Sequence, residues 1–157
     1  MAGHLPAEVN LKNELSRLRC QLRALLDSLD CGVLLCATDG RILLANQRLA
    51  QVLGLDYAKL RGCLYRDQML EQMRAELSLP DESFERWRRL DLESEEVAWD
   101  QLEIARPTPR SVERYGRPVY DEVGGLLGRL EVHRDISGQA LTEEKMQRAD
   151  RMASRTL

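Results

Sequence analysis

The sequence contains few aromatic residues and only two histidines. Phe, Trp and Tyr make up 4% of the 157 residues, and the histidines are His4 and His133. A clamp for a flat cofactor needs more rings than this. An enzyme needs a nucleophile–base or metal constellation, which two separated histidines do not supply. The sequence therefore predicts a non-catalytic chain with no metal site and no bound cofactor.

Long apolar runs and clusters of one charge are also missing. No run approaches the ~18 consecutive apolar residues of a membrane span, and no secretory apolar segment follows Met1. The 23 basic and 26 acidic residues are interspersed and give a net charge of −3, whereas a nucleic-acid surface requires a basic patch. We therefore expect a cytoplasmic protein whose partners are neither membranes nor nucleic acids.

The cysteines, at positions 20, 31, 36 and 63, are not spaced as metal-binding pairs. We interpret them as reduced thiols that are mostly buried as small apolar residues. Cys31 and Cys36 flank a predicted strand and point to opposite faces, so they cannot easily bridge each other. Whether Cys36 or Cys63 is redox active is left open by the sequence.

Residues 31–54 carry the clearest structural signal in the chain. Two short apolar runs, 32–36 and 41–45, are separated by Thr-Asp-Gly, which is typical of a hairpin turn because glycine adopts a positive φ. Asn46 follows where a helix N-cap belongs, and Gly54 follows where a helix ends. The segment therefore predicts an antiparallel hairpin followed by a capped helix.

This hairpin–cap–helix order resembles the opening of a PAS domain. Residues 108–137 are similar to the last two strands of that family, and residues 134–137, Arg-Asp-Ile-Ser, match its Asp-Ile-Thr exit motif with Ser in place of Thr. The resemblance implies an α+β fold over residues 31–137, in which a five-stranded antiparallel sheet carries helices on one face. It also implies sensing and dimerisation, without naming the signal.

The middle of the chain, residues 64–98, predicts two helices separated by Pro80. In a PAS domain this region holds the helices that wall the ligand cavity. A small ligand of unknown identity could occupy such a cavity here; the alternative is that the same side chains simply fill the core. The candidate lining residues are Met69, Met73, Trp87, Trp99, Leu102 and Tyr115.

The region around Cys63 only partly resembles the motif of flavin-binding LOV photoreceptors. A cysteine stands near the right place, but the motif's Asn is missing and Gln68 comes one position late. A flavin or haem sensor is therefore a lesser alternative, and Cys63 is better explained as a packing residue.

The predicted last strand, 126–136, alternates between two kinds of side chain. Arg129, Glu131 and His133 fall on one face, and Leu130 and Val132 fall on the other. His133 is expected to face solvent or a neighbouring helix.

The first 30 residues predict an amphipathic dimerisation helix. Its leucines follow steps of 4, 3, 4, 3 and 4, which is the spacing of an a/d heptad seam. The alternative is a helix folded onto its own sheet. The seam consists of Leu11, Leu15, Leu18, Leu22, Leu25 and Leu29.

Residues 138–157 predict a second helix, with Thr142 as its cap. The segment resembles the connector helix that follows PAS domains in sensor histidine kinases, and we expect it to continue into a part absent from this chain. Arg134, Asp135 and Ser137 lie at the junction and are predicted to couple the sheet to this helix.

Together these features predict a PAS sensory and dimerisation module of a two-component signal-transduction protein. It would form a homodimer through the N-terminal helix, with the C-terminal helix as a further contact. It would act on an output domain in cis, with a histidine kinase as the leading candidate. The alternatives are a ligand-free dimerising adaptor and a flavin- or haem-bearing redox or light sensor.

Overall fold

The computed structural model describes residues 5–77, 81–89, 92–105 and 108–155. Its centre is a five-stranded antiparallel sheet with the strand order β2-β1-β5-β4-β3. The expected α+β fold class is confirmed. The strands are β1 (Gly32–Ala37), β2 (Ile42–Ala45), β3 (Ala98–Ile104), β4 (Arg110–Tyr120) and β5 (Leu126–Asp135). The helices are α1 (Leu5–Ser28), α2 (Gln47–Leu53), α3 (Tyr57–Arg61), α4 (Arg66–Glu76), α5 (Asp81–Arg88) and α6 (Ser137–Arg155).

The predicted hairpin and capped helix are both present. Gly40 adopts a φ of 90° in the turn between β1 and β2, and the Asp39 carboxylate accepts a hydrogen bond from the Arg41 amide. Asn46 is the N-cap of α2, and Gly54 ends that helix in the left-handed conformation. Local turn and cap chemistry therefore sets the first third of the domain, as the sequence indicated.

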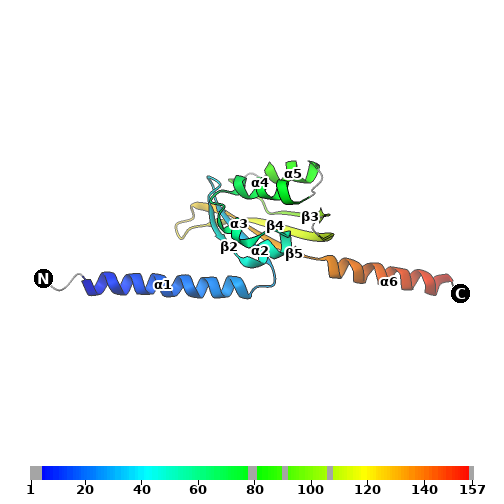
Figure 1. Cartoon of the computed structure of the whole chain (residues 1–157), viewed down its shortest axis with the longest axis horizontal. Helices are drawn as coiled ribbons and strands as arrows, with labels where there is room; N and C mark the ends of the chain where they lie inside the picture. Colours follow the sequence, from blue (N-terminus) through cyan, green and yellow to red (C-terminus); the bar gives the residue numbers. More distant parts are fainter. Residues whose placement is uncertain (1–4, 78–80, 90–91, 106–107, 156–157) are drawn as a thin grey trace.

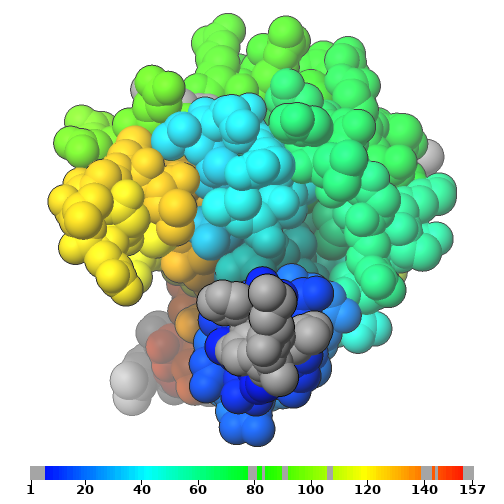
Figure 2. Space-filling model, turned by 90° about the vertical axis from the view of Figure 1, so that its left-hand side faces the viewer, coloured from blue at the N-terminus to red at the C-terminus, as the bar shows by residue number. Residues whose placement is uncertain are grey.

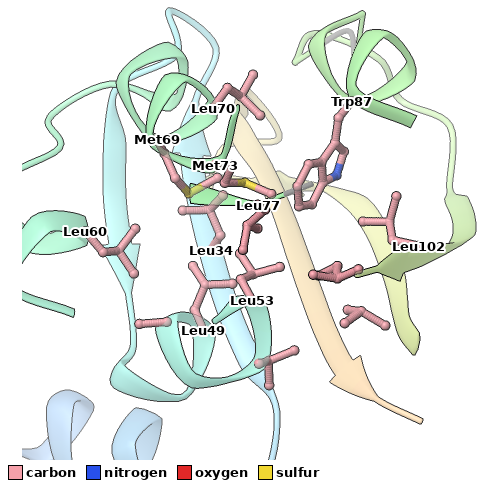
Figure 3. Packing of buried hydrophobic residues seen from close by; sticks show 14 of the residues in the cluster. Leu34, Leu49, Leu53, Leu60, Met69, Leu70, Met73, Leu77, Trp87 and Leu102 are labelled. Carbon is pink, nitrogen blue, oxygen red and sulfur yellow. The ribbon is translucent and has the colours of Figure 1, made fainter. Parts of the chain in front are cut away.

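One face of the sheet is covered by helices, and the apolar core lies between the two layers (Figure 1). Met69 and Met73 of α4 and Trp87 of α5 point towards Leu34 of β1 and Leu53 of α2 (Figure 3). All five side chains are at most 1% exposed. Methionine fills irregular gaps well, which suits a core built from several short helices.

Helix α1 contacts the edge of its own domain at β2, but its leucine seam is not buried there. The N-terminal part of the helix extends beyond the domain (Figure 1). Its last turns lie beside β2, where Leu22 and Leu26 line a shared groove with Ile42, and the helix abuts the domain when viewed end-on (Figure 2). Among its described side chains, Leu26 is the one that is half-buried. All six seam leucines are between 42% and 65% exposed in the single chain.

Helix α6 lies on the same side of the sheet as α1 and extends from the opposite end of the domain, so that both helices run in the same direction along the chain (Figure 1). It begins at Ser137, so Thr142 lies inside the helix and the predicted cap at Thr142 was wrong. The strand β5 and the helix are separated by one residue, Ile136. No helix in the described part of the chain is both long enough and apolar enough to span a membrane.

Candidate functional site

The inner face of β5, which the helices cover, is built from ionisable side chains. Arg129, Glu131 and His133 are 1%, 3% and 0% exposed. The apolar residues Leu130 and Val132 alternate with them and are half-buried on the outer face. Burying charge is costly unless it is paired, so this strand needs a compensating arrangement on the neighbouring elements.

Neighbouring strands supply part of that compensation. The antiparallel register places Arg114 of β4 opposite His133, and Asp100 of β3 opposite Arg114. Arg114 Nε donates to Asp100 Oδ1 at 2.9 Å, and Nη2 donates to Oδ2 of the same carboxylate. This two-pronged pairing is the strongest form of an arginine–carboxylate contact.

The covering helices complete the site. Arg66 of α4 donates through Nη2 to the backbone carbonyl of Trp87 at 2.8 Å. The Arg114 guanidinium lies 5.0 Å from the centre of the Trp87 ring, and the His133 ring meets Trp87 edge-on at 5.6 Å. We call the ionisable residues of this site the buried polar cluster; they are Arg66, Asp100, Arg114, Arg129, Glu131 and His133.

The buried polar cluster is incompletely paired. Glu131 Oε1 lies 3.7 Å from both Arg66 Nη2 and Arg114 Nη1, which is too long for a hydrogen bond. Native proteins leave few buried polar atoms without partners, so such a concentration needs an explanation. Counting partners among the described residues alone, the buried atoms of this site without a hydrogen-bond partner are Arg66 Nε, Trp87 Nε1, Arg114 Nη1, Arg129 Nε, Glu131 Oε1, and Nδ1 and Nε2 of His133.

Among the charged residues of the cluster, Arg129 has the fewest partners that compensate its charge. Its Nη1 donates to the Ser94 carbonyl at 3.2 Å, but no carboxylate among the described residues forms an ion pair with it. Its guanidinium lies over Gly116, where an added Cβ would meet Nη2 at 3.2 Å. A buried cation held only by a carbonyl is a site that favours an anion.

The surroundings alter the proton affinities of two buried groups. Burial, together with the nearby charges of Arg114 and Arg66, lowers the pKa of His133 to about 3 against the opposing charge of Asp100. His133 is therefore neutral at pH 7. Burial and the Glu131 carboxylate raise the pKa of the Cys36 thiol to about 12, although Arg66 opposes them. Cys36 is thus a protonated thiol, a form that is a poor nucleophile.

Cys63 is also a packing residue. It is half-buried against the apolar core, its Sγ donates to the Lys59 carbonyl at 3.4 Å, and burial raises the pKa of its thiol. These contacts agree with the interpretation that the sequence favoured for Cys63.

Four of the predicted cavity-lining residues lie inside the domain. Met69, Met73, Trp87 and Leu102 are each at most 1% exposed. Trp99 and Tyr115 lie outside the interior and are 60% and 39% exposed. These two pair with each other across β3 and β4 on the outer face of the sheet, because their neighbours Asp100 and Arg114 take the inner positions.

Most of the cluster was not identified as a site from the sequence. The alternation of β5 put Arg129, Glu131 and His133 on one face correctly, and His133 does face a neighbouring helix, through Trp87. The missed signal was that β3 and β4 also place a charged residue on the same face, Asp100 and Arg114. Three adjacent strands with inward charges indicate a polar interior.

A groove of about 410 Å³ opens onto this cluster from the surface. It runs between the end of α5, the segment that leads into β3, and the strands beneath. Its lining residues are Arg86, Arg89, Ser94, Glu96, Val97, Ala98, Trp99, Asp100, Arg114 and Arg129.

Asn46 joins α1 to the domain through four hydrogen bonds. Its Oδ1 accepts from the amides of Val33 at 2.8 Å and Leu49 at 3.0 Å. Its Nδ2 donates to the carbonyls of Leu26 at 2.8 Å and Cys31 at 3.0 Å. This one side chain, 1% exposed, therefore ties together the end of α1, the start of β1 and the start of α2.

The exit from β5 into α6 is held by a similar but smaller network. Asp135 Oδ1 accepts from the Ser137 amide at 2.9 Å, and Ser137 Oγ accepts from the Ser111 amide of β4 at 2.9 Å. Partial burial works to raise the pKa of Asp135, but the hydrogen bonds from Ser137 and the charges of Arg110 and Arg48 outweigh it, so the pKa is lowered. Asp135 is thus the cap, and Ser137 ties the helix to the sheet.

The family model described as the PAS fold matches residues 26–141, which is most of the chain. This chain belongs to the PAS family. No curated protein sequence matches it.

Solved PAS structures share the fold at low sequence identity. The PAS domain of Bordetella pertussis BvgS is 17% identical, with 87% of this chain and 98% of that chain covered and a TM-score of 0.55. The domain of a putative light and redox sensing histidine kinase from Haloarcula marismortui is 20% identical, with 74% and 97% covered and a TM-score of 0.52. The phage VqmA–DPO complex is 15% identical, with 94% and 63% covered and a TM-score of 0.53.

The buried polar cluster thus lies in the interior of a PAS sensory domain, between its sheet and helices α4 and α5. The junctions at Asn46 and Asp135 lie where α1 enters the PAS domain and α6 leaves it.

Proposed function

We propose that this PAS domain is a cytoplasmic, non-catalytic sensory and dimerisation module. In this proposal the buried polar cluster receives the signal, and α6 passes it to an output domain outside this chain. A histidine kinase is the favoured output, since one of the structures that share this fold is a domain of a putative histidine kinase. The observation that carries the proposal is the set of unpartnered buried polar atoms on the strand that leads into α6.

The route from the cluster to α6 is short. His133 lies two residues before Asp135, which caps the helix. Arg114 of the cluster lies on β4, three residues after Ser111, whose amide donates to Ser137. A small shift of β5 relative to β4 would therefore alter the hydrogen bonds at the start of α6. Two discrete arrangements of such a contact can bias the output.

Two unpartnered apolar surfaces support dimerisation. One is the leucine seam of α1, which is exposed along its whole length. The other is the outer face of the sheet, where Trp99 and Tyr115 are exposed and Leu35, Leu130 and Val132 are half-buried. Apolar surface of this extent is typical of an interface. In α6, Met146 is 64% exposed and offers a further contact between protomers.

A ligand-free dimerising adaptor is the second candidate. It is favoured by one observation: Met69, Met73 and Trp87 fill the space between the sheet and helices α4 and α5 with apolar side chains (Figure 3). The adaptor function would require dimerisation, but it would not explain why Arg129 is buried without a charged partner.

The dimer is tested by one substitution in the seam. Leu18→Asp places a carboxylate in the predicted interface of both protomers and removes about 2 kcal/mol of apolar burial from each, so we expect dimer affinity to fall on the order of 1,000-fold. Sedimentation equilibrium measures this directly. The matched control is Ser16→Asp, on the same helix but outside the seam, which should leave the affinity nearly unchanged. A wild-type monomer, or equal effects of the two substitutions, would contradict the dimer proposal.

A further inference from the structure

Arg129 is a buried cation whose counter-ion is missing from the described part of the chain. The structure gives it one carbonyl partner, Ser94, and leaves its Nε without an acceptor although the residue is 1% exposed. By contrast, Arg114 is paired with Asp100, and Arg66 lies beside Glu131. Burying an uncompensated guanidinium is unfavourable, so this position is prepared for an anion.

The charge balance of the cluster leads to the same conclusion. Three arginines, Arg66, Arg114 and Arg129, face two carboxylates, Asp100 and Glu131, and His133 is neutral. The formal sum of these charges is 3 − 2 = +1. A single negative charge would neutralise the interior. Arg129 and Arg114 are also the arginines of the cluster that line the groove, and each has a buried nitrogen without an acceptor.

The groove gives a route for such a group and distinguishes between kinds of anion. Arg86 and Arg89 stand at the α5 side of the groove and add positive charge at its mouth, which the single carboxylate of Glu96 offsets in part. Val97 and Ala98 line the β3 side and offer apolar contact, whereas the Trp99 indole lies on the outer face, where its Nε1 donates to Glu113. Apolar contact beside a buried cation suits an organic anion better than an inorganic one.

We propose that this groove binds a small organic acid, with its carboxylate at Arg129 and Arg114 and its carbon skeleton against Val97 and Ala98. This inference rests on the proposed sensory function and assigns the chemical class of the signal. The groove volume of about 410 Å³ lies within the range of small-molecule sites.

The test is thermal unfolding of the full chain in the sodium salts of acetate, succinate, citrate and benzoate, each compared with sodium chloride and sodium phosphate at equal ionic strength and neutral pH. We expect at least one carboxylate to raise Tm by roughly 5–10 °C at a concentration 100-fold above its Kd. A response to phosphate alone would overturn the organic-acid assignment, and equal Tm values in all salts would overturn the site.

Two variants connect the response to the groove. Arg129→Met keeps the length of the side chain and removes its charge, so it should weaken carboxylate binding at least about tenfold. Arg88→Met is the control. Arg88 is an exposed arginine at the end of α5 that does not line the groove, so its replacement should leave carboxylate binding unchanged. Equal weakening in both variants would show a non-specific charge effect and overturn the proposal.

Because Arg129→Met could prevent folding, carboxylate binding is also measured on the wild-type chain. The Nε–Hε signal of Arg129 in a ¹⁵N NMR spectrum should shift when the stabilising carboxylate is added, while that of Arg88 stays in place. An unmoved Arg129 signal would overturn the inference. A dimer that binds no carboxylate would contradict the organic-acid proposal alone. A monomer that binds a carboxylate would contradict the dimerisation proposal alone.

Discussion

Replacing Arg114 with methionine should lower the free energy of unfolding by about 3–5 kcal/mol, because it breaks a buried ion pair and leaves its partner without compensation. The Arg114 and Asp100 side chains are 7% and 16% exposed, so water cannot substitute for the guanidinium. Glu131 would also lose one of the two arginines that stand 3.7 Å from it. Urea denaturation of wild type and variant measures the difference.

Two further variants isolate the cause of that loss. Lys59→Met removes the ion pair with Glu76, in which the Lys59 side chain is 56% exposed, and it should change stability little because exposed pairs are weak. Adding Asp100→Asn to Arg114→Met should recover part of the lost unfolding free energy, because the unpaired carboxylate of Asp100 is then removed. If Arg114→Met costs no more than Lys59→Met, the cluster is not the tightly coupled unit described above.

Acid should destabilise this protein through His133. Burial, aided by Arg114 and Arg66, lowers the pKa of His133 to about 3 in the folded state, against an ordinary value of about 6.5 in the unfolded chain. Between these pH values the unfolded state binds more protons, so stability is fully present above pH 6.5 and falls as the pH is lowered. The slope is about 1.4 kcal/mol per pH unit, so the loss at pH 5 is about 2 kcal/mol.

His133→Phe tests this directly. Phenylalanine keeps an aromatic ring beside Trp87 and cannot titrate, so the difference in unfolding free energy between pH 7 and pH 5 should be about 2 kcal/mol smaller in the variant. Other acid-sensitive groups, including Asp135 with its lowered pKa, are common to both proteins and cancel in the comparison. The charged groups around the ring are Arg66 from α4, Asp100 from β3, Arg114 from β4 and Glu131 from β5. Identical pH profiles would contradict a neutral, buried His133.

The parts of this fold that local chemistry determines were predicted from the sequence. A turn glycine, an asparagine cap and a helix-ending glycine act on their immediate neighbours, so residues 31–54 could be interpreted without knowledge of the rest of the chain. The β5 alternation was also correct. The position of α1 could not be predicted, since its leucine stripe suits its own sheet and a partner helix equally well.

The candidate site could not be predicted in the same way, because it depends on which face of the sheet the helices cover. Hydrophobic burial would place Leu130 and Val132 inward and Arg129 and Glu131 outward, yet the structure has the reverse. That reversal also moved Trp99 and Tyr115 to the outer face. The register between β3, β4 and β5 decides these placements, and it is a long-range property that local patterns do not specify.

Hydrogen–deuterium exchange measures the coupling between the buried polar cluster and α6 most directly. The experiment compares the full chain with and without the carboxylate salt that raises Tm most, in wild type and in Asp135→Ala. We predict that in wild type the amides of β5 and the first turn of α6 both change their exchange rates on binding. In Asp135→Ala, β5 should still respond while the first turn of α6 does not, because the cap that joins them is gone. A wild-type protein in which β5 responds and α6 stays unchanged would show binding without transmission and contradict the account.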